Sequence, residues 1–168
     1  MSGCPQYVNY GAQGICRVEG VRSARFGGAK ARDYYLLSPV HQPETSIYLP
    51  VDNPLLASKM RPVLTPEEID RTIRSVRGIR MPWIEDFHLR AQRFSEILSR
   101  RDERELLLLV GCLYLRGEQR PQGLSIGDRQ TLRQAQRIVE EEFSFSLHLQ
   151  ADQVGAYIRN LLGLSDSR

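Results

Sequence analysis

The sequence predicts an α+β protein in which a small β domain precedes a compact bundle of about five helices. The first fifty residues contain short β-prone runs that are separated by glycines and prolines. After residue 64, apolar residues recur at helical spacing, and several of these segments begin with helix-capping residues. We therefore expect a β domain over residues 1–60 and a helical domain over residues 61–168.

Composition and charge suit a soluble protein with a real core. The chain has 168 residues, of which 41% are hydrophobic, and a net charge of +3. Its N-terminus lacks a basic region followed by an apolar run. The most apolar segment, 106–115, is too short for a bilayer core of about 30 Å. We expect a cytoplasmic monomer without membrane contact.

Four or five short strands are predicted in the β domain. The second alternates apolar and polar residues with period two, as half-buried strands do. Pro50 lacks an N–H group and therefore fits an edge or a strand end. So small a sheet must be strongly bent or form an open barrel, and it leaves edges to which another protein's strand can add. The alternative is that the chain's own loops cover these edges. The predicted strands are Tyr7–Tyr10, Ile15–Val21, Asp33–Leu37 and Ser46–Val51.

Five helices are predicted after the sheet. Thr65 and Glu68 can form a capping box around Pro66, which suits the first helical position. Asp102 and Glu105 predict a second box before a segment so apolar that it should lie at the centre of the bundle. The predicted helices are 66–77, 83 or 84 to 99, 106–114, 128–145 and 151–162.

No catalytic or metal-binding motif is found. Glycine-rich phosphate loops, GxSxG and HExxH are all absent from the sequence. The cysteines are scattered, form no CxxC pair and have no histidines at ligand spacing, so we expect reduced thiols and neither metal nor cofactor. The run Glu140–Glu142 is expected to be a solvated helix face, and His88 to face solvent. We therefore predict that the protein is not an enzyme.

The helix near the only tryptophan carries two stripes. The first is expected to pack in the core, with Trp83 either closing the bundle as a lid or projecting from its end. The second is basic, and flat aromatic rings flanked by arginines suit stacking on an unpaired base with phosphate contacts. The first stripe contains Trp83, Phe87, Ala91, Phe94 and Leu98; the second contains Asp86, Arg90, Arg93, Ile97 and Arg101.

Taken in order, several fragments of the chain resemble the CarD/CdnL-like transcription regulators and the polymerase-interacting domain of the transcription-repair coupling factor. Each fragment is weakly specific, but all occur in the same order and at similar spacing, from about Tyr7 to Leu162. The fragments are Val8–Val18, Tyr34–Leu37, Ile47–Asn53, Met60–Leu64, Trp83–Asp86, Arg93–Leu98, Glu105–Leu106 with Leu113–Tyr114, and Glu141–Phe143.

The resemblance implies a Tudor-like β barrel that binds the β subunit of bacterial RNA polymerase. Tyr48 matches a position that faces the polymerase in relatives, and Arg22 lies near another. The helical domain would contact promoter DNA with little sequence specificity and stabilise the open complex at the upstream edge of the bubble. A tryptophan serves there as a wedge, and two alignments assign this role to Trp83 or to Phe87.

In this interpretation Arg90 and Arg93 lie beside the wedge and contact DNA. Two other hypotheses remain open. The protein could be an adaptor that binds polymerase or another partner without touching DNA, with Trp83 in its core. It could also be a sequence-specific DNA-binding protein, although no short helix-turn-helix with a basic second helix is found.

Overall fold

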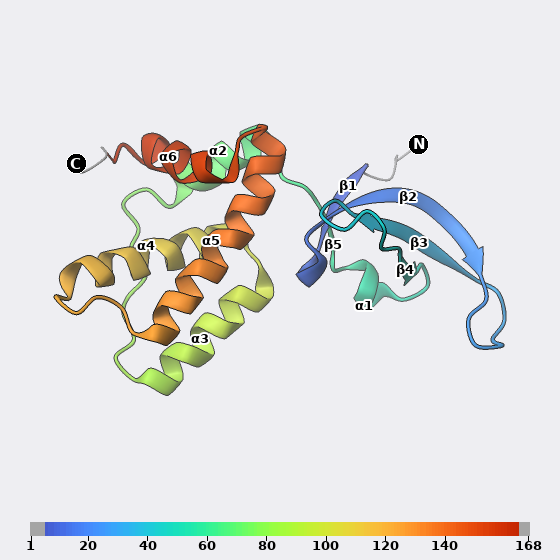
Figure 1. Ribbon diagram of the computed structural model, residues 1–168, viewed down its shortest axis with the longest axis horizontal. Coiled ribbons are helices and arrows are strands. Elements are labelled where there is room, and N and C mark those ends of the chain that lie inside the picture. Colours follow the sequence, from blue (N-terminus) through green and yellow to red (C-terminus); the bar gives the residue numbers. More distant parts are fainter. Residues whose placement is uncertain (1–5, 165–168) are drawn as a thin grey trace. The chain divides into compact units, whose positions relative to one another are not determined.

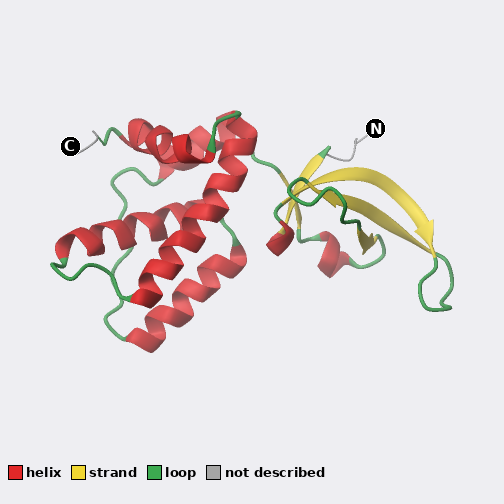
Figure 2. Cartoon of the chain, in the orientation of Figure 1, coloured by secondary structure: helices red, strands yellow, loops and turns green. Residues whose placement is uncertain are grey.

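A computed structural model describes residues 6–164 of the chain, which divides into two compact units between Val63 and Leu64. The N-terminal unit contains all the strands, and the C-terminal unit contains the long helices (Figures 1 and 2). The predicted α+β class is confirmed.

The N-terminal unit is a five-stranded antiparallel sheet with the order β4-β3-β2-β1-β5. Within residues 6–63, β4 and β5 are the edge strands and do not pair with each other, so closure into a barrel is not confirmed. Pro50 ends β4, as its missing N–H group predicts. The elements are β1 (Tyr7–Tyr10), the 3-10 helix η1 (Gly11–Gln13), β2 (Ile15–Ala24), β3 (Arg32–Pro39), β4 (Ile47–Pro50), α1 (Pro54–Ala57) and β5 (Met60–Pro62).

The hairpin of β2 and β3 is longer than predicted and curved (Figure 1). The register shifts between Val18 and Gly20, which marks a β-bulge. Gly20 has a φ of 123°, a conformation that favours glycine. Beyond the bulge the strands continue to the pair Ala24–Arg32. The bulge explains how one strand can bend and still remain paired along its length.

One face of this sheet forms the core of the N-terminal unit. Val8, Cys16, Leu37 and Leu49 are almost completely buried there. Cys16 therefore packs as a small apolar side chain. Of the other two cysteines, Cys112 is half-buried in the helical unit, and Cys4 lies outside the described part of the chain.

Between residues 64 and 164, the C-terminal unit forms five helices. Its first begins with the predicted capping box: the Glu68 N–H donates to Thr65 Oγ1 at 3.2 Å, and the Thr65 N–H donates to Glu68 Oε2 at 2.8 Å. Asp102 also caps its helix, although Glu105 turns to nearby arginines and does not complete a box. The helices are α2 (Pro66–Ser75), α3 (Phe87–Arg100), α4 (Glu103–Gln119), α5 (Ile126–Leu147) and α6 (Ala151–Leu162).

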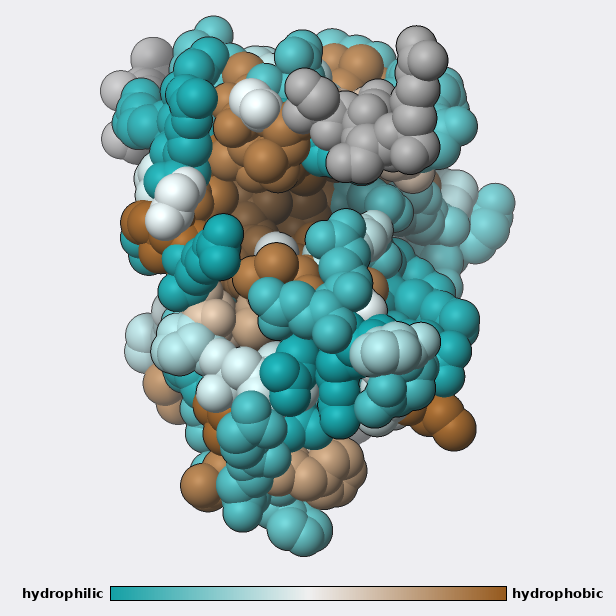
Figure 3. Space-filling view, turned by 90° about the vertical axis from the view of Figure 1, so that its left-hand side faces the viewer, coloured by the Kyte–Doolittle hydropathy of each residue, from teal (hydrophilic) through white to brown (hydrophobic). Residues whose placement is uncertain are grey.

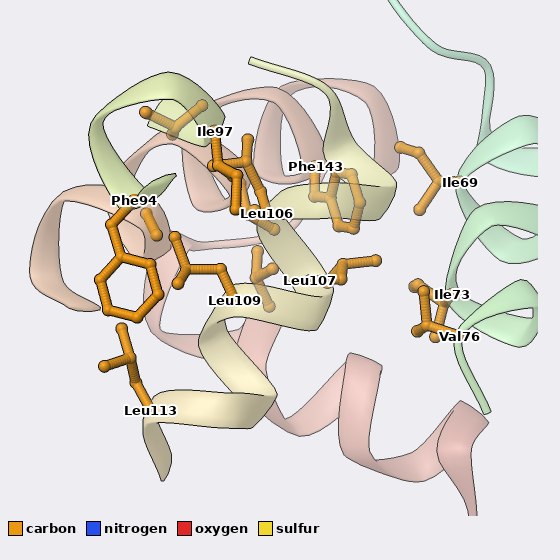
Figure 4. Close-up of a cluster of buried hydrophobic side chains, with 14 residues drawn as sticks. Ile69, Ile73, Val76, Phe94, Ile97, Leu106, Leu107, Leu109, Leu113 and Phe143 are labelled. Carbon is orange, nitrogen blue, oxygen red and sulfur yellow. The ribbon is translucent and has the colours of Figure 1, made fainter. Parts of the chain in front are cut away.

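Helix α4 lies at the centre of this unit, as its apolar sequence predicts. Leu106, Leu109 and Leu113 have no solvent exposure. Figure 4 shows the α4 leucines between α2 and α3, with Phe143 of α5 beside them. The helix is longer than the predicted 106–114, because it begins at Glu103 and continues to Gln119.

The start of α3 also differs from the prediction. Asp86 accepts a hydrogen bond from the Leu89 N–H at 2.9 Å and is the N-cap, so the helix begins at Phe87. This hydrogen bond also lowers the pKa of Asp86. Trp83 therefore lies in the segment before the helix and does not share its periodicity.

The expectation that the Glu140–Glu142 run is a solvated helix face is wrong for its last residue. Glu142 has a relative exposure of 1%, and its Oε1 accepts a hydrogen bond from the Leu64 N–H at 2.9 Å. Ser146 donates to the Leu64 carbonyl oxygen at 2.5 Å. Helix α5 therefore binds both backbone groups of Leu64, the residue that begins the helical unit.

Tyr157 joins α6 to α2 through a hydrogen bond from its hydroxyl group to the Asp70 carboxylate. This bond, with burial as the second cause, raises the pKa of Tyr157 from 10.0 to about 12. A group whose pKa is higher in the folded state than in the unfolded state stabilises the fold. This stabilisation is complete at pH values below the unfolded-state pKa and is lost as the pH rises through the folded-state pKa. We therefore expect the helical unit to lose stability between pH 10 and 12. Urea titrations across this range should show a smaller loss in Tyr157→Phe; an unchanged loss would contradict the interpretation.

Candidate functional site

Three aromatic side chains contact one another on the surface of the N-terminal unit. Phe26, Tyr34 and Tyr48, called here the β aromatic cluster, meet edge to face with ring centroids 5.2–6.1 Å apart. Phe26 is 51% exposed and Tyr48 is 42% exposed. Large aromatic groups exposed together in this way are typical of protein interfaces.

Strand alternation explains why these rings share a face. Tyr35 and Leu37 of β3 point into the core, so Tyr34 and Leu36 point to the opposite face. Tyr48 is the partner of Leu36 across β3 and β4, and paired residues project to the same side. The cluster therefore lies on the face of the sheet opposite its core, and it includes Tyr48 of the edge strand β4.

Cationic side chains surround this cluster along the β2–β3 hairpin. Arg22 is exposed and pairs in register with Tyr34, so the predicted site residues Arg22 and Tyr48 share one face. Arg25 and Lys30 are exposed near the tip, while Arg32 is paired with an aspartate. Phe26 was missed at the sequence level. Its signal is an aromatic residue between an arginine and the Gly27–Gly28 turn.

The second aromatic site surrounds Trp83 in the helical unit. Two guanidinium groups lie against its ring: Arg90 Cζ is 4.5 Å and Arg116 Cζ is 4.8 Å from the centroid. The ring also meets Phe94 edge to face at 6.3 Å and packs against the main core. Cation–π contacts of this kind stabilise a ring in one position. Trp83 is therefore a half-buried lid of the bundle.

Arg90 holds the segment that contains Trp83. Its side chain is buried and pairs with Asp128, with Nε to Oδ1 at 3.3 Å and Nη2 to Oδ2 at 3.4 Å. Its Nη1 donates to the carbonyl oxygens of Ile84 at 2.9 Å and Glu85 at 3.1 Å. Asp128 also accepts a hydrogen bond from Ser125 Oγ at 2.7 Å. The role that these contacts indicate for Arg90 is structural.

The remaining arginines of α3 lie close to acidic groups. Arg93 approaches Glu96 at 3.6 Å and Glu105 at 3.4 Å. Glu105 also accepts hydrogen bonds from Arg100 Nε and Nη2, both at 2.9 Å, and the side-chain bond raises the pKa of Arg100 further. The positive charge predicted for this helix is therefore largely compensated within the chain.

Phe87 is 58% exposed at the first position of α3 and contacts the His88 ring, which is also exposed. The prediction that Phe87 belongs to the core is wrong. The inward face of α3 is formed by Arg90, Phe94 and Ile97, because these residues meet α4 and α5. Phe87 lies outside this stripe, and its ring centroid is 5.7 Å from Arg90 Cζ.

No metal site is formed by the residues that the structure describes. Among residues 6–164, no three histidine, cysteine, aspartate or glutamate side chains gather in a way that could hold an ion. The helices found in that range are also too short or too polar to cross a membrane.

Comparison with protein families gives a match to the first unit. Residues 6–64 match the family model of the CarD-like/TRCF RID domain. The N-terminal unit is a CarD-like/TRCF RID domain. The match ends next to the boundary between the two units, and no curated protein matches the chain.

The RID domain is a protein-interaction domain, and its family is associated with RNA polymerase in transcription. In this chain the RID domain carries the β aromatic cluster and its neighbour Arg22 on one face. Trp83, Phe87, Arg90 and Arg93 lie outside the matched residues, in the helical unit.

Proposed function

We propose that this protein is a bacterial transcription regulator whose RID domain binds the β subunit of RNA polymerase through the face that carries Arg22 and Tyr48. The observation that supports this proposal is the exposed β aromatic cluster on a domain of this family. Aromatic anchors contribute a large share of the binding energy at interfaces. The edge strand β4 lies beside the cluster, and a polymerase strand could add along it.

The proposal is tested by binding purified RNA polymerase to the Tyr48→Glu variant. A charge in place of a central aromatic group should cost about 2 kcal/mol or more, which is at least about a thirtyfold loss of affinity. Tyr114→Glu is the matched control, because Tyr114 is 50% exposed on the helical unit. Full binding by Tyr48→Glu would contradict the proposed interface.

We further propose that the helical unit contacts promoter DNA at the upstream edge of the transcription bubble and stabilises the open complex. Phe87 is the aromatic ring most exposed at this end of α3, whereas Trp83 is half-buried against the core. Stacking of an exposed ring on an unpaired base requires no sequence reading. The contact would be made by a monomer recruited through the RID domain, so it needs few phosphate contacts of its own.

The pairing of the α3 arginines favours a second candidate. Arg90, Arg93 and Arg100 all contact carboxylates of the same chain, which leaves α3 with little net positive charge. An adaptor that binds polymerase without touching DNA would not need a positively charged surface on α3. The two candidates differ in the effect of Phe87 on open-complex lifetime.

A further inference from the structure

A pocket of about 530 Å³ opens in the helical unit between α4, the end of α6 and the segment that joins α2 to α3. Pockets that bind small molecules typically measure about 300–1,000 Å³. The brown hollow in Figure 3 shows how apolar this face is. Its lining includes Arg77, Arg80, Trp83, Leu108, Gly111 and Leu115.

The pocket is apolar in its walls and cationic at its rim. Its lining includes three arginines, Arg77, Arg80 and Arg116, and contains neither aspartate nor glutamate among the described residues. Arg77 and Arg80 are exposed, and no ion pair to another described residue is found for either. Such a lining favours a ligand with an apolar body and a negatively charged end.

Gly111 gives a second and independent indication of a ligand. It lies in the middle of α4, where glycine costs about 1 kcal/mol relative to alanine. A Cβ atom at Gly111 would meet no atom within 4 Å, whereas one at Gly117 in the same helix would touch Leu124 at 3.4 Å. Packing within the described chain therefore does not require glycine at position 111. A Cβ atom at this position would lie in open space beside the pocket that Gly111 lines.

We propose that this pocket binds a small amphipathic carboxylate. Its apolar body would lie against Leu108, Leu115 and the Trp83 ring, and its carboxylate would pair with Arg77 and Arg80 at the rim. This function is independent of polymerase binding, since no residue of the RID domain lines the pocket. A bound ligand would also touch Trp83, the lid that Arg90 and Arg116 hold.

The test uses decanoate as the probe and the full chain as the protein. Trp83 is the only tryptophan and lines the pocket, so its fluorescence reports occupancy directly. We expect a saturable change of Trp83 fluorescence with decanoate, and at least about tenfold weaker binding of neutral decanol. Absence of a saturable change with decanoate would overturn the proposal. Equal binding of decanol would overturn the inference that the ligand carries a negative charge.

Gly111→Leu is the decisive variant, because Gly111 lines the pocket and a Cβ atom added there would meet no atom within 4 Å. We expect it to lose the decanoate response while its melting temperature stays equal or rises. Gly127→Leu is the matched control: Gly127 is also helical, a Cβ atom added there would also meet no atom within 4 Å, and it lies outside the pocket. Decanoate binding by Gly111→Leu as tight as by Gly127→Leu would overturn the site.

The rim is tested separately with the double variant Arg77→Gln/Arg80→Gln. Both side chains are exposed, so the fold should tolerate the change. We expect its affinity for decanoate to fall at least about tenfold, to the level of decanol. Undiminished decanoate binding would show that these arginines do not receive the carboxylate and would overturn that assignment.

Discussion

Replacing Arg90 with alanine should lower the free energy of unfolding of the helical unit by about 3–5 kcal/mol. The reason is that Asp128 is 5% exposed, so the substitution leaves a buried carboxylate without its cationic partner. It also removes the donors to the Ile84 and Glu85 carbonyl oxygens and one of the two guanidinium groups on Trp83. Urea unfolding followed by far-ultraviolet circular dichroism measures the loss.

Two variants control for this interpretation. Arg93→Ala removes exposed ion pairs and should cost less than about 1 kcal/mol. Arg90→Met combined with Asp128→Leu removes both buried charges and should recover much of the lost stability, because apolar groups of similar size can replace a buried pair. A small loss in Arg90→Ala, equal to that in Arg93→Ala, would show that the buried pair does not stabilise the fold.

Replacing Phe87 with alanine should shorten the lifetime of the polymerase open complex about fivefold to a hundredfold. Stacking of a base on an aromatic side chain contributes about 1–3 kcal/mol, and each 1.4 kcal/mol is a factor of about ten. Because Phe87 is 58% exposed, the substitution should change the free energy of unfolding of the protein by less than about 0.5 kcal/mol. Dissociation of preformed complexes after addition of a competitor measures the lifetime.

Trp83→Ala separates the lid role from a wedge role. Trp83 packs on the core and contacts Arg90, Arg116 and Phe94, so its removal should lower the melting temperature more than Phe87→Ala does. Both variants could leave the open-complex lifetime per folded molecule unchanged while polymerase binding stays intact. That result would exclude a DNA contact by Trp83 or Phe87. The adaptor would then be the better description.

Helix starts that depend on a hydrogen bond within a single turn could be predicted from the sequence. Thr65 bonds to Glu68, and Asp102 caps through Glu105, three residues away in each case. Such bonds can be inferred from a short window of sequence because donor and acceptor lie within one turn. At α3 the same chemistry was present in Asp86, but it was placed inside the helix and not at its cap. The predicted core stripe was therefore right for Phe94 and wrong for Phe87, and it left out Arg90 and Ile97.

The roles of Arg90 and Glu142 could not be inferred in this way. Arg90 is separated from Asp128 by 38 positions, and Glu142 from Leu64 by 78 positions. Seen alone, each is a charged residue on a helix, and such residues usually face solvent. Their burial is decided by partners that only the tertiary fold brings near. The β aromatic cluster likewise depends on the tertiary fold, because Phe26 in the β2–β3 loop meets Tyr48 of β4, more than twenty positions away.

The pairing of β5 with β1 has a consequence for folding during synthesis. Val8 of β1 is the partner of Pro62, so this edge of the sheet joins residues more than fifty positions apart. Until residues 60–62 leave the ribosome, β1 has only β2 beside it and exposes a free strand edge, which favours association with other chains. A fragment that ends before Met60 would retain that free edge. Soluble expression of the RID domain should therefore require residues 60–62, although this segment contributes only three residues to the sheet.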